Sequence, residues 1–370
     1  MREYSQELVN ALQAQQEEVD MNGTQVILKV NPEEARAGYL DPYELKLMMK
    51  WFENSRQPAA PAAPLSPEEQ LEQVRDSMGF PNRNLNTAEI YTGYECVRLG
   101  DNEVGLWRYY PRKSMRKPDK PCLIYIHGGG WIGGTVFAVE NPCRLIAELA
   151  DAVVFNIDYS LAPEHKFPNG FNDCFNAVQY IYEHAEEYGI DRNRIAIGGD
   201  SAGGNLTAAV AVKDRDLGTG MVAGQILIYP CVTFLNGVNG YQWELSQFEM
   251  ADEQRAMIDP MLGIGRPTEA DPEVRKGWEL YLPSEEDVRS PFASPLLADS
   301  KGLPRTLCIG AEFDGLRIQS EVYSRQLANA GVPVKTIRYK GCTHAFIDRL
   351  GFVPQAEDLC IEIANALKAL

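Results

Sequence analysis

The sequence predicts an α/β fold in which a mostly parallel sheet is covered by helices on both faces. Short apolar runs rich in Ile and Val alternate with helical stretches over most of the chain. Continuous apolar runs are typical of strands buried on both faces, and strand–helix alternation favours parallel pairing. The apolar runs lie at residues 122–127, 152–159, 194–200, 225–230, 306–312 and 334–340.

Two segments before these runs, 94–100 and 103–111, predict an antiparallel hairpin that leads into the sheet. The helices expected between and after the strands lie at residues 141–150, 171–188, 205–213, 320–330 and 355–370. We therefore assign residues 91–370 to one sheet-based domain.

Residues 1–90 differ from the rest, and we expect them to form a helical appendage that contributes to a cap. The proline-rich stretch 57–67 excludes both helix and strand. Ser66 is a good N-cap for the helix that follows, with Glu69 close to a capping-box place. The helices expected before this stretch lie at residues 3–18 and 42–54.

One connection, residues 231–304, interrupts the alternation for far longer than an ordinary loop. An insertion of this length beside a sheet is usually functional. It contains too many aromatic residues for a disordered linker, namely Tyr241, Trp243, Phe248, Trp278 and Tyr281. We interpret it as a cap or lid over a pocket; additional scaffold or an oligomer contact is the alternative.

The composition excludes several classes of partner. A formal net charge of −17 argues against nucleic acid and anionic membrane surfaces, which bind clustered Lys and Arg. None of the 8 cysteines is paired as CxxC, and no Cys/His cluster has metal-ligand spacing. The sequence shows no signal-type segment and no run of about eighteen apolar residues. We therefore expect a cytoplasmic protein with no membrane span and no metal.

The strongest chemical signal is the motif GGDSAGGN at residues 198–205. Gly199, Ser201 and Gly203 form a G-x-S-x-G pattern between a predicted strand and a predicted helix, which is the context of a nucleophile elbow. Small residues must flank a serine in so tight a turn, and the amides that begin the helix favour developing negative charge. The pattern therefore predicts Ser201 as a nucleophile.

A second signal is HGGGW at residues 127–131, directly after the first apolar run. Three consecutive glycines let backbone N–H groups approach a substrate oxygen closely. We predict an oxyanion hole from the amides of Gly129, Gly130 and Ala202, with Gly128 a weaker candidate. No nucleotide-binding glycine motif is present, and nothing in the sequence requires a cofactor.

Histidine is scarce enough to identify a general base. The chain has 4 histidines: His127 belongs to the glycine loop, and only His344 lies downstream of Ser201. Folds with such an elbow place the residues in the chain order Ser, then Asp or Glu, then His on a late loop. The elbow and the chain order therefore select His344 together.

The acid that orients this base should follow the run at 306–312. Asp314 and Glu312 are both close, and we favour Asp314 because Gly315 after it suits a turn that presents a carboxylate. Asp348 comes after the histidine, against the expected order.

Together, HGGGW, GDSAGG and the intervening DYSLAPEHKFP resemble the hormone-sensitive-lipase-like family of esterases, in its GDSAG branch. The resemblance runs from about Tyr94 to the C-terminus and includes SPFASPL at residues 290–296. It implies an α/β-hydrolase fold with an eight-stranded sheet and a helical cap, and hydrolysis of short-to-medium acyl esters. The family's catalytic triad maps onto Ser201, Asp314 and His344.

The sequence departs from the family pattern in three ways. Gly315 stands where members often have proline, and Ser160 where many have arginine. The N-terminal extension and the insertion are longer than expected, which leaves the cap shape and the substrate size open.

Several residues around the site have two interpretations. Trp131, Trp243 and Phe346 are candidates to line a pocket for a small ester substrate, with plain core packing as the alternative. Asp200 and Glu164 are candidates to hold the neighbouring loops, or else solvated acids.

Two other functions remain open on the same scaffold. An amidase or a sugar deacetylase would use the same triad. A receptor that binds small molecules without catalysis is disfavoured, because His344 is present. An exposed edge at the last strand would allow a homodimer.

Overall fold

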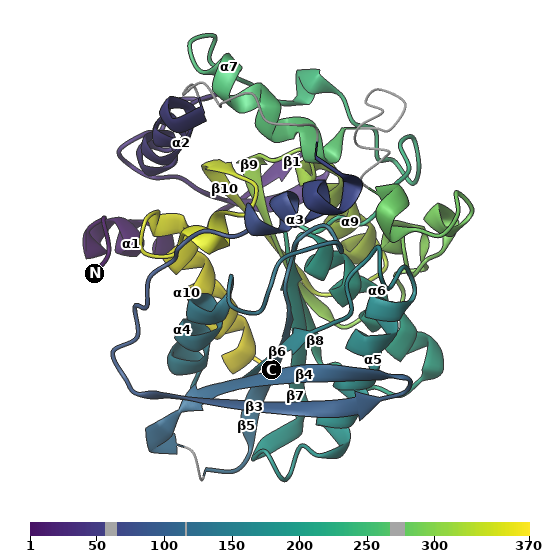
Figure 1. Cartoon of the computed structure of the whole chain (residues 1–370). Helices are drawn as coiled ribbons and strands as arrows, with labels where there is room; N and C mark the ends of the chain where they lie inside the picture. Colours follow the sequence, from purple (N-terminus) through teal and green to yellow (C-terminus); the bar gives the residue numbers. More distant parts are fainter. Residues whose placement is uncertain (56–64, 115–116, 267–277) are drawn as a thin grey trace.

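The computed structural model describes residues 1–55, 65–114, 117–266 and 278–370. In these ranges a mixed ten-stranded sheet has the order β1-β2-β10-β9-β8-β7-β5-β6-β4-β3 (Figure 1). Pairing is parallel from β2 to β6 along this order, while β1 and the β3–β4 hairpin pair antiparallel, as predicted for the hairpin. The strands are β1 (Glu18–Met21), β2 (Thr24–Lys29), β3 (Ile90–Leu99), β4 (Asn102–Pro111), β5 (Lys120–Ile126), β6 (Val153–Asp158), β7 (Ile190–Asp200), β8 (Gly224–Ile228), β9 (Arg305–Phe313) and β10 (Val334–Thr343).

The expected number of eight strands is wrong, because the N-terminal segment supplies a further hairpin. β1 and β2 pair across a turn at Asn22 and Gly23, whose φ angles are 56° and 82°. Asn-Gly suits a two-residue hairpin turn because both residues tolerate positive φ. The appendage is therefore not purely helical. β2 pairs in parallel with β10, so the edge of the last strand, expected to be exposed for a homodimer, is covered.

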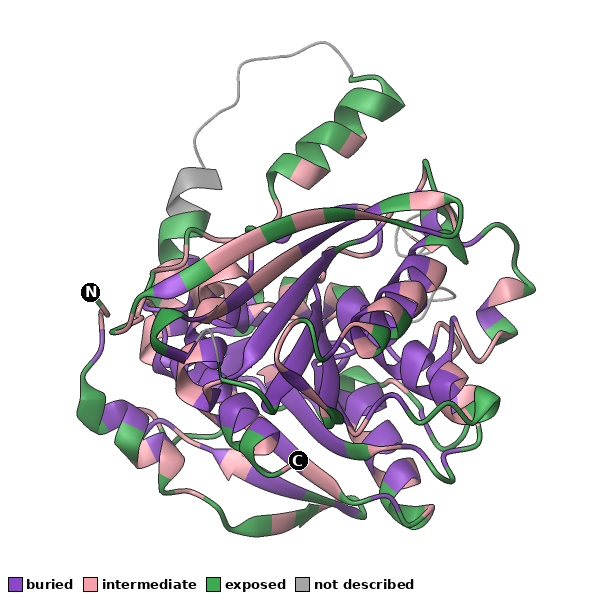
Figure 2. Cartoon of the chain, turned by 90° about the horizontal axis from the view of Figure 1, so that it is seen from below, coloured by how far each residue is buried: buried purple, intermediate pink, exposed green. Residues whose placement is uncertain are grey.

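Helices cover both faces of the sheet and bury a separate apolar core on each side. α4 (Glu140–Ala150) and α10 (Pro354–Lys368) pack on one face (Figure 1). The other face carries α5 (Asn169–Glu183), α6 (Ala202–Leu217) and α9 (Arg317–Asn329). Figure 2 shows the central strands as buried, which is why their sequences are continuous apolar runs.

Before β3, the described residues form three helices: α1 (Gln6–Gln13), α2 (Pro42–Ser55) and α3 (Pro67–Asp76). Ser66 caps α3 as predicted: its hydroxyl accepts from the amide of Glu69, whose carboxylate accepts from the amide of Ser66. Most of the proline-rich stretch 57–67 lies outside the described residues.

The insertion at 231–304 contains only short helices in its described parts. α7 lies at the top of Figure 1, on the same side of the sheet as α2 and α3. Every helix in the described ranges is too short or too polar to span a bilayer. The remaining short helices are η1 (Arg112–Ser114), η2 (Leu245–Gln247), α7 (Arg255–Ile258), η3 (Asp259–Gly265), η4 (Asp287–Arg289), η5 (Pro295–Leu297) and η6 (Phe346–Arg349).

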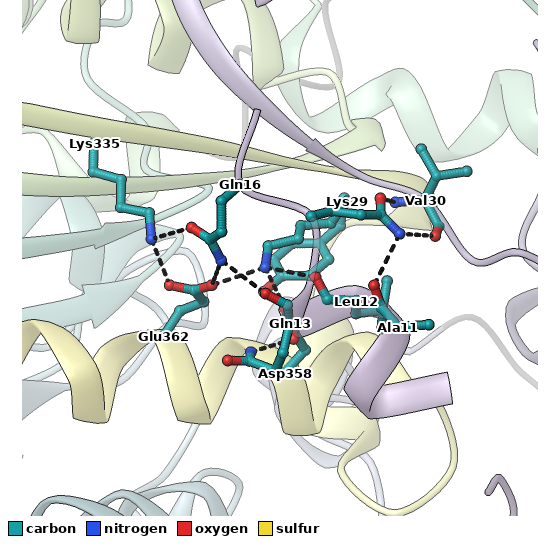
Figure 3. A network of polar contacts seen from close by, with 11 residues as sticks. Ala11, Leu12, Gln13, Gln16, Lys29, Val30, Lys335, Asp358 and Glu362 are labelled. Atoms are coloured by element: carbon teal, nitrogen blue, oxygen red, sulfur yellow. Dashed lines mark hydrogen bonds and ion pairs between the residues drawn. The ribbon is translucent and has the colours of Figure 1, made fainter. Parts of the chain in front are cut away.

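Buried charges attach the N-terminal hairpin to α10 (Figure 3). The Lys29 side chain is fully buried, with Nζ 2.8 Å from Glu362 and 3.6 Å from Asp358. Nζ also donates to the carbonyl of Leu12 at 2.8 Å. A buried ammonium group is tolerated where such partners replace water. The cluster therefore fixes β2 against α10.

Candidate active site

Ser201 lies at the turn between β7 and α6, with a φ of 55° and a ψ of −116°. Non-glycine residues rarely adopt this backbone conformation, and such strain is common at functional sites. A Cβ on Gly203 would lie 1.9 Å from the carbonyl oxygen of Ile126, and one on Gly199 would lie 2.4 Å from the same atom. Only glycine fits at these two positions. The turn therefore presents the Ser201 side chain at the carboxyl end of β7.

Ser201, His344 and Asp314 form a continuous chain of hydrogen bonds. Nε2 of His344 lies 2.9 Å from Oγ of Ser201, and Nδ1 lies 2.7 Å from Oδ2 of Asp314. Asp314 is fully buried, and its Oδ1 accepts from the amide of Leu316 at 2.8 Å. An ionised carboxylate can only accept hydrogen bonds, so Nδ1 carries the proton. Nε2 is then free to accept the proton of the serine hydroxyl.

The sheet order brings these three residues together. Ser201 directly follows β7, Asp314 directly follows β9 and His344 directly follows β10, in a sheet ordered β10-β9-β8-β7. The carboxyl ends of parallel strands meet at one edge, which is the usual place for a site in α/β folds. The ring of Tyr229, just after β8, packs against the His344 ring with centroids 4.7 Å apart. Glu312, the other candidate acid, accepts instead from the amide of Gly341 in β10, at 2.8 Å.

The glycine loop after β5 leaves two amides without a protein acceptor. Gly129 and Gly130 have φ angles of 124° and 60°, and a Cβ on Gly129 would lie 2.1 Å from the carbonyl oxygen of Gly133. Neither of their N–H groups donates to an acceptor in the part of the chain that the structure describes. Gly128, the weaker candidate, donates its N–H to Oδ1 of Asp200 at 3.0 Å. The N–H groups of Gly129 and Gly130 are therefore available to an incoming oxygen, whereas that of Gly128 is already used.

The two acids expected to hold neighbouring loops both make such contacts. Asp200 is buried and accepts from the hydroxyl of Tyr125 at 2.9 Å as well as from Gly128. Burial raises the pKa of Asp200, and these hydrogen bonds oppose that shift. Glu164 forms a bidentate ion pair with Arg75 of α3, at 2.7 and 2.9 Å. This pair joins the N-terminal segment to the loop after β6.

A cavity of about 210 Å³ opens beside Ser201 and has mainly apolar walls. Besides Ser201, the polar residues that line it include Arg266, whose guanidinium pairs with Asp259 at 2.8 Å. The residues that line it include Gly130, Trp131, Ala202, Phe234, Tyr241, Ile264 and Trp278.

A second cavity of about 380 Å³ also reaches Ser201, on the side of His344. It includes Met78 and Gly79 from the end of α3, Ile264 from the insertion, and Asp348. A larger cavity of about 430 Å³ lies near the amino ends of β8 and β9, and its lining does not include Ser201, Asp314 or His344. The candidate active site therefore includes the 210 Å³ and 380 Å³ cavities, which both reach Ser201.

The three aromatic residues expected in the pocket lie in different places. Trp131 lines the 210 Å³ cavity. Trp243 does not line that cavity. Its ring packs beside the guanidinium of Arg266, a residue that does line the cavity. The structure corrects the assignment of Phe346: its side chain is fully buried in the core and contacts the Tyr339 ring at 5.1 Å. The chain turns after His344, so the next aromatic side chain points into the core.

Several lining residues were not singled out from the sequence as pocket residues. Tyr241 and Trp278 were noted only as aromatic residues of the insertion, although both line the 210 Å³ cavity. Met78, Gly79 and Ile264 carry no local signal, because their position depends on how α3 and the insertion fold over the sheet.

Comparison with protein families gives a match to the α/β-hydrolase fold family over residues 123–348. The match spans more than half of the chain and includes all three residues of the hydrogen-bonded chain at Ser201. The chain is a hormone-sensitive-lipase-like α/β hydrolase.

Several relatives of this α/β hydrolase are named as esterases. An arylesterase of Saccharolobus solfataricus is 33% identical over 252 residues, which are 68% of this chain and 75% of the relative. The carboxylesterase NlhH of Mycobacterium tuberculosis is 31% identical over 288 residues, 77% of this chain and 82% of the relative.

Solved structures of esterases share the fold of this α/β hydrolase. A thermostable carboxylesterase from a metagenomic library has a TM-score of 0.67 at 30% identity, covering 82% of this chain and 97% of that one. An arylesterase structure has a TM-score of 0.73 at 28% identity, covering 89% and 99%. These relatives identify the α/β hydrolase as a serine carboxylesterase.

Proposed function

We propose that this carboxylesterase hydrolyses short-to-medium acyl esters through an acyl-enzyme formed on Ser201. The observation that carries the proposal is the chain of hydrogen bonds from Ser201 through His344 to Asp314, at 2.9 and 2.7 Å, on a strained elbow. A serine that lacked a role in covalent chemistry would need neither the base nor the strain.

In the first step Ser201 attacks the ester carbonyl while Nε2 of His344 takes the hydroxyl proton. Asp314 holds the imidazole in the productive tautomer and stabilises the imidazolium that forms. Because Asp314 is fully buried, its interaction with the imidazolium is little screened by water.

The oxyanion of the tetrahedral intermediate would rest on the amides of Gly129, Gly130 and Ala202. Loss of one such donor typically costs about 3 kcal/mol of transition-state stabilisation. His344 then protonates the leaving alcohol, and a water molecule attacks the acyl-enzyme by the same sequence of proton transfers.

The two cavities that meet at Ser201 give the acyl and alcohol parts of an ester separate space. Residues 231–304 contribute Ile264 to both cavities, and residues 1–90 contribute Met78 to the larger of the two. We therefore propose that both segments form a cap that limits the size of the substrate.

Initial rates on p-nitrophenyl esters from acetate to palmitate test this function. We expect the highest kcat/KM at short-to-medium chains, since both cavities are small. Ser201→Ala should lower kcat by roughly 10⁶-fold, the scale seen when a triad serine is removed. Thermal unfolding should be almost unchanged.

Ser246→Ala, which changes an exposed serine of the insertion, is the matched control and should keep its activity. Near-native turnover by Ser201→Ala would disprove the nucleophile assignment. If no p-nitrophenyl ester is turned over but a fluorophosphonate still labels Ser201, the substrate is an amide or a sugar acetate instead.

A further inference from the structure

Arg349 holds the loop that carries His344. Its guanidinium donates to Oγ1 of Thr343 at 2.8 Å and to the backbone carbonyl of His344 itself at 3.3 Å. The rigid fork of an arginine can make both contacts at once. Arg349 therefore holds the side chain of Thr343 and the backbone carbonyl of His344, the residue that carries the imidazole.

Arg349 is in turn held by Glu44, in the first turn of α2. The Glu44 carboxylate is fully buried and pairs with the guanidinium through Oε2, which also accepts from the hydroxyl of Thr343 at 3.4 Å. Burial raises the pKa of Glu44, and the Arg349 charge opposes that shift. Removal of either partner leaves a buried charge without compensation.

The chain just before Glu44 approaches the same loop through contacts of its own. The amide of Asp41 donates to the carbonyl of Gly341 at 3.0 Å. Gly341 has a φ of 73°, and a Cβ there would lie 2.4 Å from the Asp41 nitrogen. The Asp41 carboxylate accepts from Asn31 at 2.8 Å and from Gln355 at 2.6 Å. A change at Glu44 therefore removes a charge while these contacts keep the start of α2 in place.

The other titratable groups that face the imidazole of His344 are acidic or neutral. Asp314 is its hydrogen-bond partner, and Asp200 interacts with it electrostatically. Burial and the neighbouring Asp200 raise the pKa of Asp348 well above its usual range. Burial also raises the pKa of Tyr229 and lowers the pKa of His127. Arg349 supplies a positive charge beside these groups, and the carboxylate of Glu44 balances that charge.

We propose that Glu44 and Arg349 are positioning residues for His344, which they hold through its backbone carbonyl. The inference rests on the proposed role of His344 as the general base. It makes the N-terminal segment part of the catalytic apparatus, because a misplacement of about 1 Å can cost up to about 100-fold in rate.

The test compares Glu44→Gln, Arg349→Lys and the control Glu362→Gln. Glu362 is a matched control, because it is another buried glutamate that ties the N-terminal segment to the core, through Lys29, without contact to the His344 loop. Rates on a p-nitrophenyl ester are divided by the active-site concentration, measured by fluorophosphonate titration. Thermal unfolding and the pH profile of kcat/KM are recorded for each variant.

We expect Glu44→Gln and Arg349→Lys to lower kcat per active site by roughly tenfold or more, with little change in KM. Glu44→Gln leaves the Arg349 charge unbalanced, which disfavours an imidazolium nearby, so the acid limb of its pH profile should move to lower pH. Arg349→Lys keeps the charge but loses the fork, so its acid limb should stay in place. Glu362→Gln should lose stability and keep both kcat per site and the profile.

Wild-type kcat per site and an unchanged acid limb in Glu44→Gln would overturn the proposal. An equal fall in Glu362→Gln would also overturn it, because the effect would then come from general destabilisation. If Glu44→Gln does not fold, the kcat per active site of Arg349→Lys decides the test, and a wild-type value would overturn the proposal. Failure of the proposed function would instead appear as an absence of ester turnover in the wild-type enzyme.

Discussion

The centre of the sheet and the N-terminal segment are stabilised by different interactions. The central strands bury continuous runs of apolar side chains between two layers of helices. The N-terminal segment buries apolar side chains such as Ile27 and Leu40 as well, but it adds buried charged groups, namely Lys29 on Glu362, Glu44 on Arg349 and the carboxylate of Asp41. Apolar burial does not depend on ionisation, whereas a buried ion pair fails when one partner loses its charge. Changes at Ser201, Asp314 and His344 should therefore act on chemistry, whereas changes at the Lys29 attachment should act on stability. The Glu44–Arg349 pair belongs to both regions, because Arg349 also contacts the residues that carry the His344 side chain.

The largest effect is expected at the catalytic edge of the sheet. Asp314→Asn should lower kcat by roughly 10⁴-fold, because an amide favours the wrong tautomer of His344. The side chain keeps its size, so the urea unfolding midpoint should remain close to that of the wild type. Steady-state kinetics and urea unfolding measure the two quantities. A variant with more than a tenth of the wild-type kcat would exclude Asp314 as the acid.

The opposite pattern is expected at the attachment. Lys29→Met should lower the free energy of unfolding by about 3 kcal/mol, because it removes the cation paired with the buried Asp358 and leaves Glu362 with Lys335 as its ion-pair partner. The value of kcat per titrated active site should be unchanged. Urea unfolding at neutral pH measures the loss. A variant as stable as the wild type would mean that the N-terminal hairpin is held by apolar contacts after all.

The same contrast explains which parts of the fold the sequence predicts. The central strands and the elbow at Ser201 follow from local pattern, since buried strands are apolar and the elbow requires small residues. The β1–β2 hairpin was missed, although Asn22 and Gly23 form the strongest short hairpin signal and are followed by a strand-like run. Its strand β2 is stabilised by pairing with β10, more than 300 positions away, which no local pattern reports.

The candidate site likewise contains residues that the sequence predicts and residues that it does not. The chain order of Ser201, Asp314 and His344 is readable from the sequence, because each follows a strand whose position in the sheet is fixed by the fold. The direction of the Phe346 side chain depends on a turn of the backbone, and an aromatic residue beside a histidine suits core and pocket equally well. Met78 reaches the cavity only because α3 folds over the sheet.

The pH dependence of stability gives a finer test of the attachment. Burial alone would raise the pKa of Glu362, but hydrogen bonds from Lys29 and Lys335 outweigh it and hold the pKa below its ordinary value of 4.5. The stability that this carboxylate contributes is therefore present above about pH 4.5 and lost as the pH falls through the lowered value. Asp358 has the opposite sign, since burial raises its pKa.

The contribution of Glu362 is isolated by subtracting the unfolding free energy of Glu362→Gln from that of the wild type at each pH. We expect the difference to favour the wild type at pH 7 and to shrink as the pH falls below about 4.5. A difference that is constant from pH 7 to pH 3 would show that the Glu362 charge does not contribute to the attachment.

The smallest effect is expected where the attachment is exposed, at Arg75 of α3. Its guanidinium donates to the carbonyls of Ile132 at 2.6 Å and Ala162 at 3.0 Å and pairs with Glu164, whose side chain is 54% exposed. Exposed ion pairs contribute at most about 1 kcal/mol, so Arg75→Ala should barely change thermal unfolding. Met78, three residues further on, lines a cavity at Ser201.

Loosening α3 should therefore raise KM for a p-nitrophenyl ester by roughly two- to fivefold, the scale of 1 kcal/mol or less, and leave kcat unchanged. Arg112→Ala is the matched control, since it removes a similar exposed pair with Glu89 and lines neither cavity. A fall in kcat with an unchanged KM in Arg75→Ala would mean that α3 acts on the chemical step, as we propose for Glu44, and not on substrate access. The N-terminal segment would then position the catalytic residues along its whole length, and the distinction between its buried and exposed contacts would lie in magnitude alone.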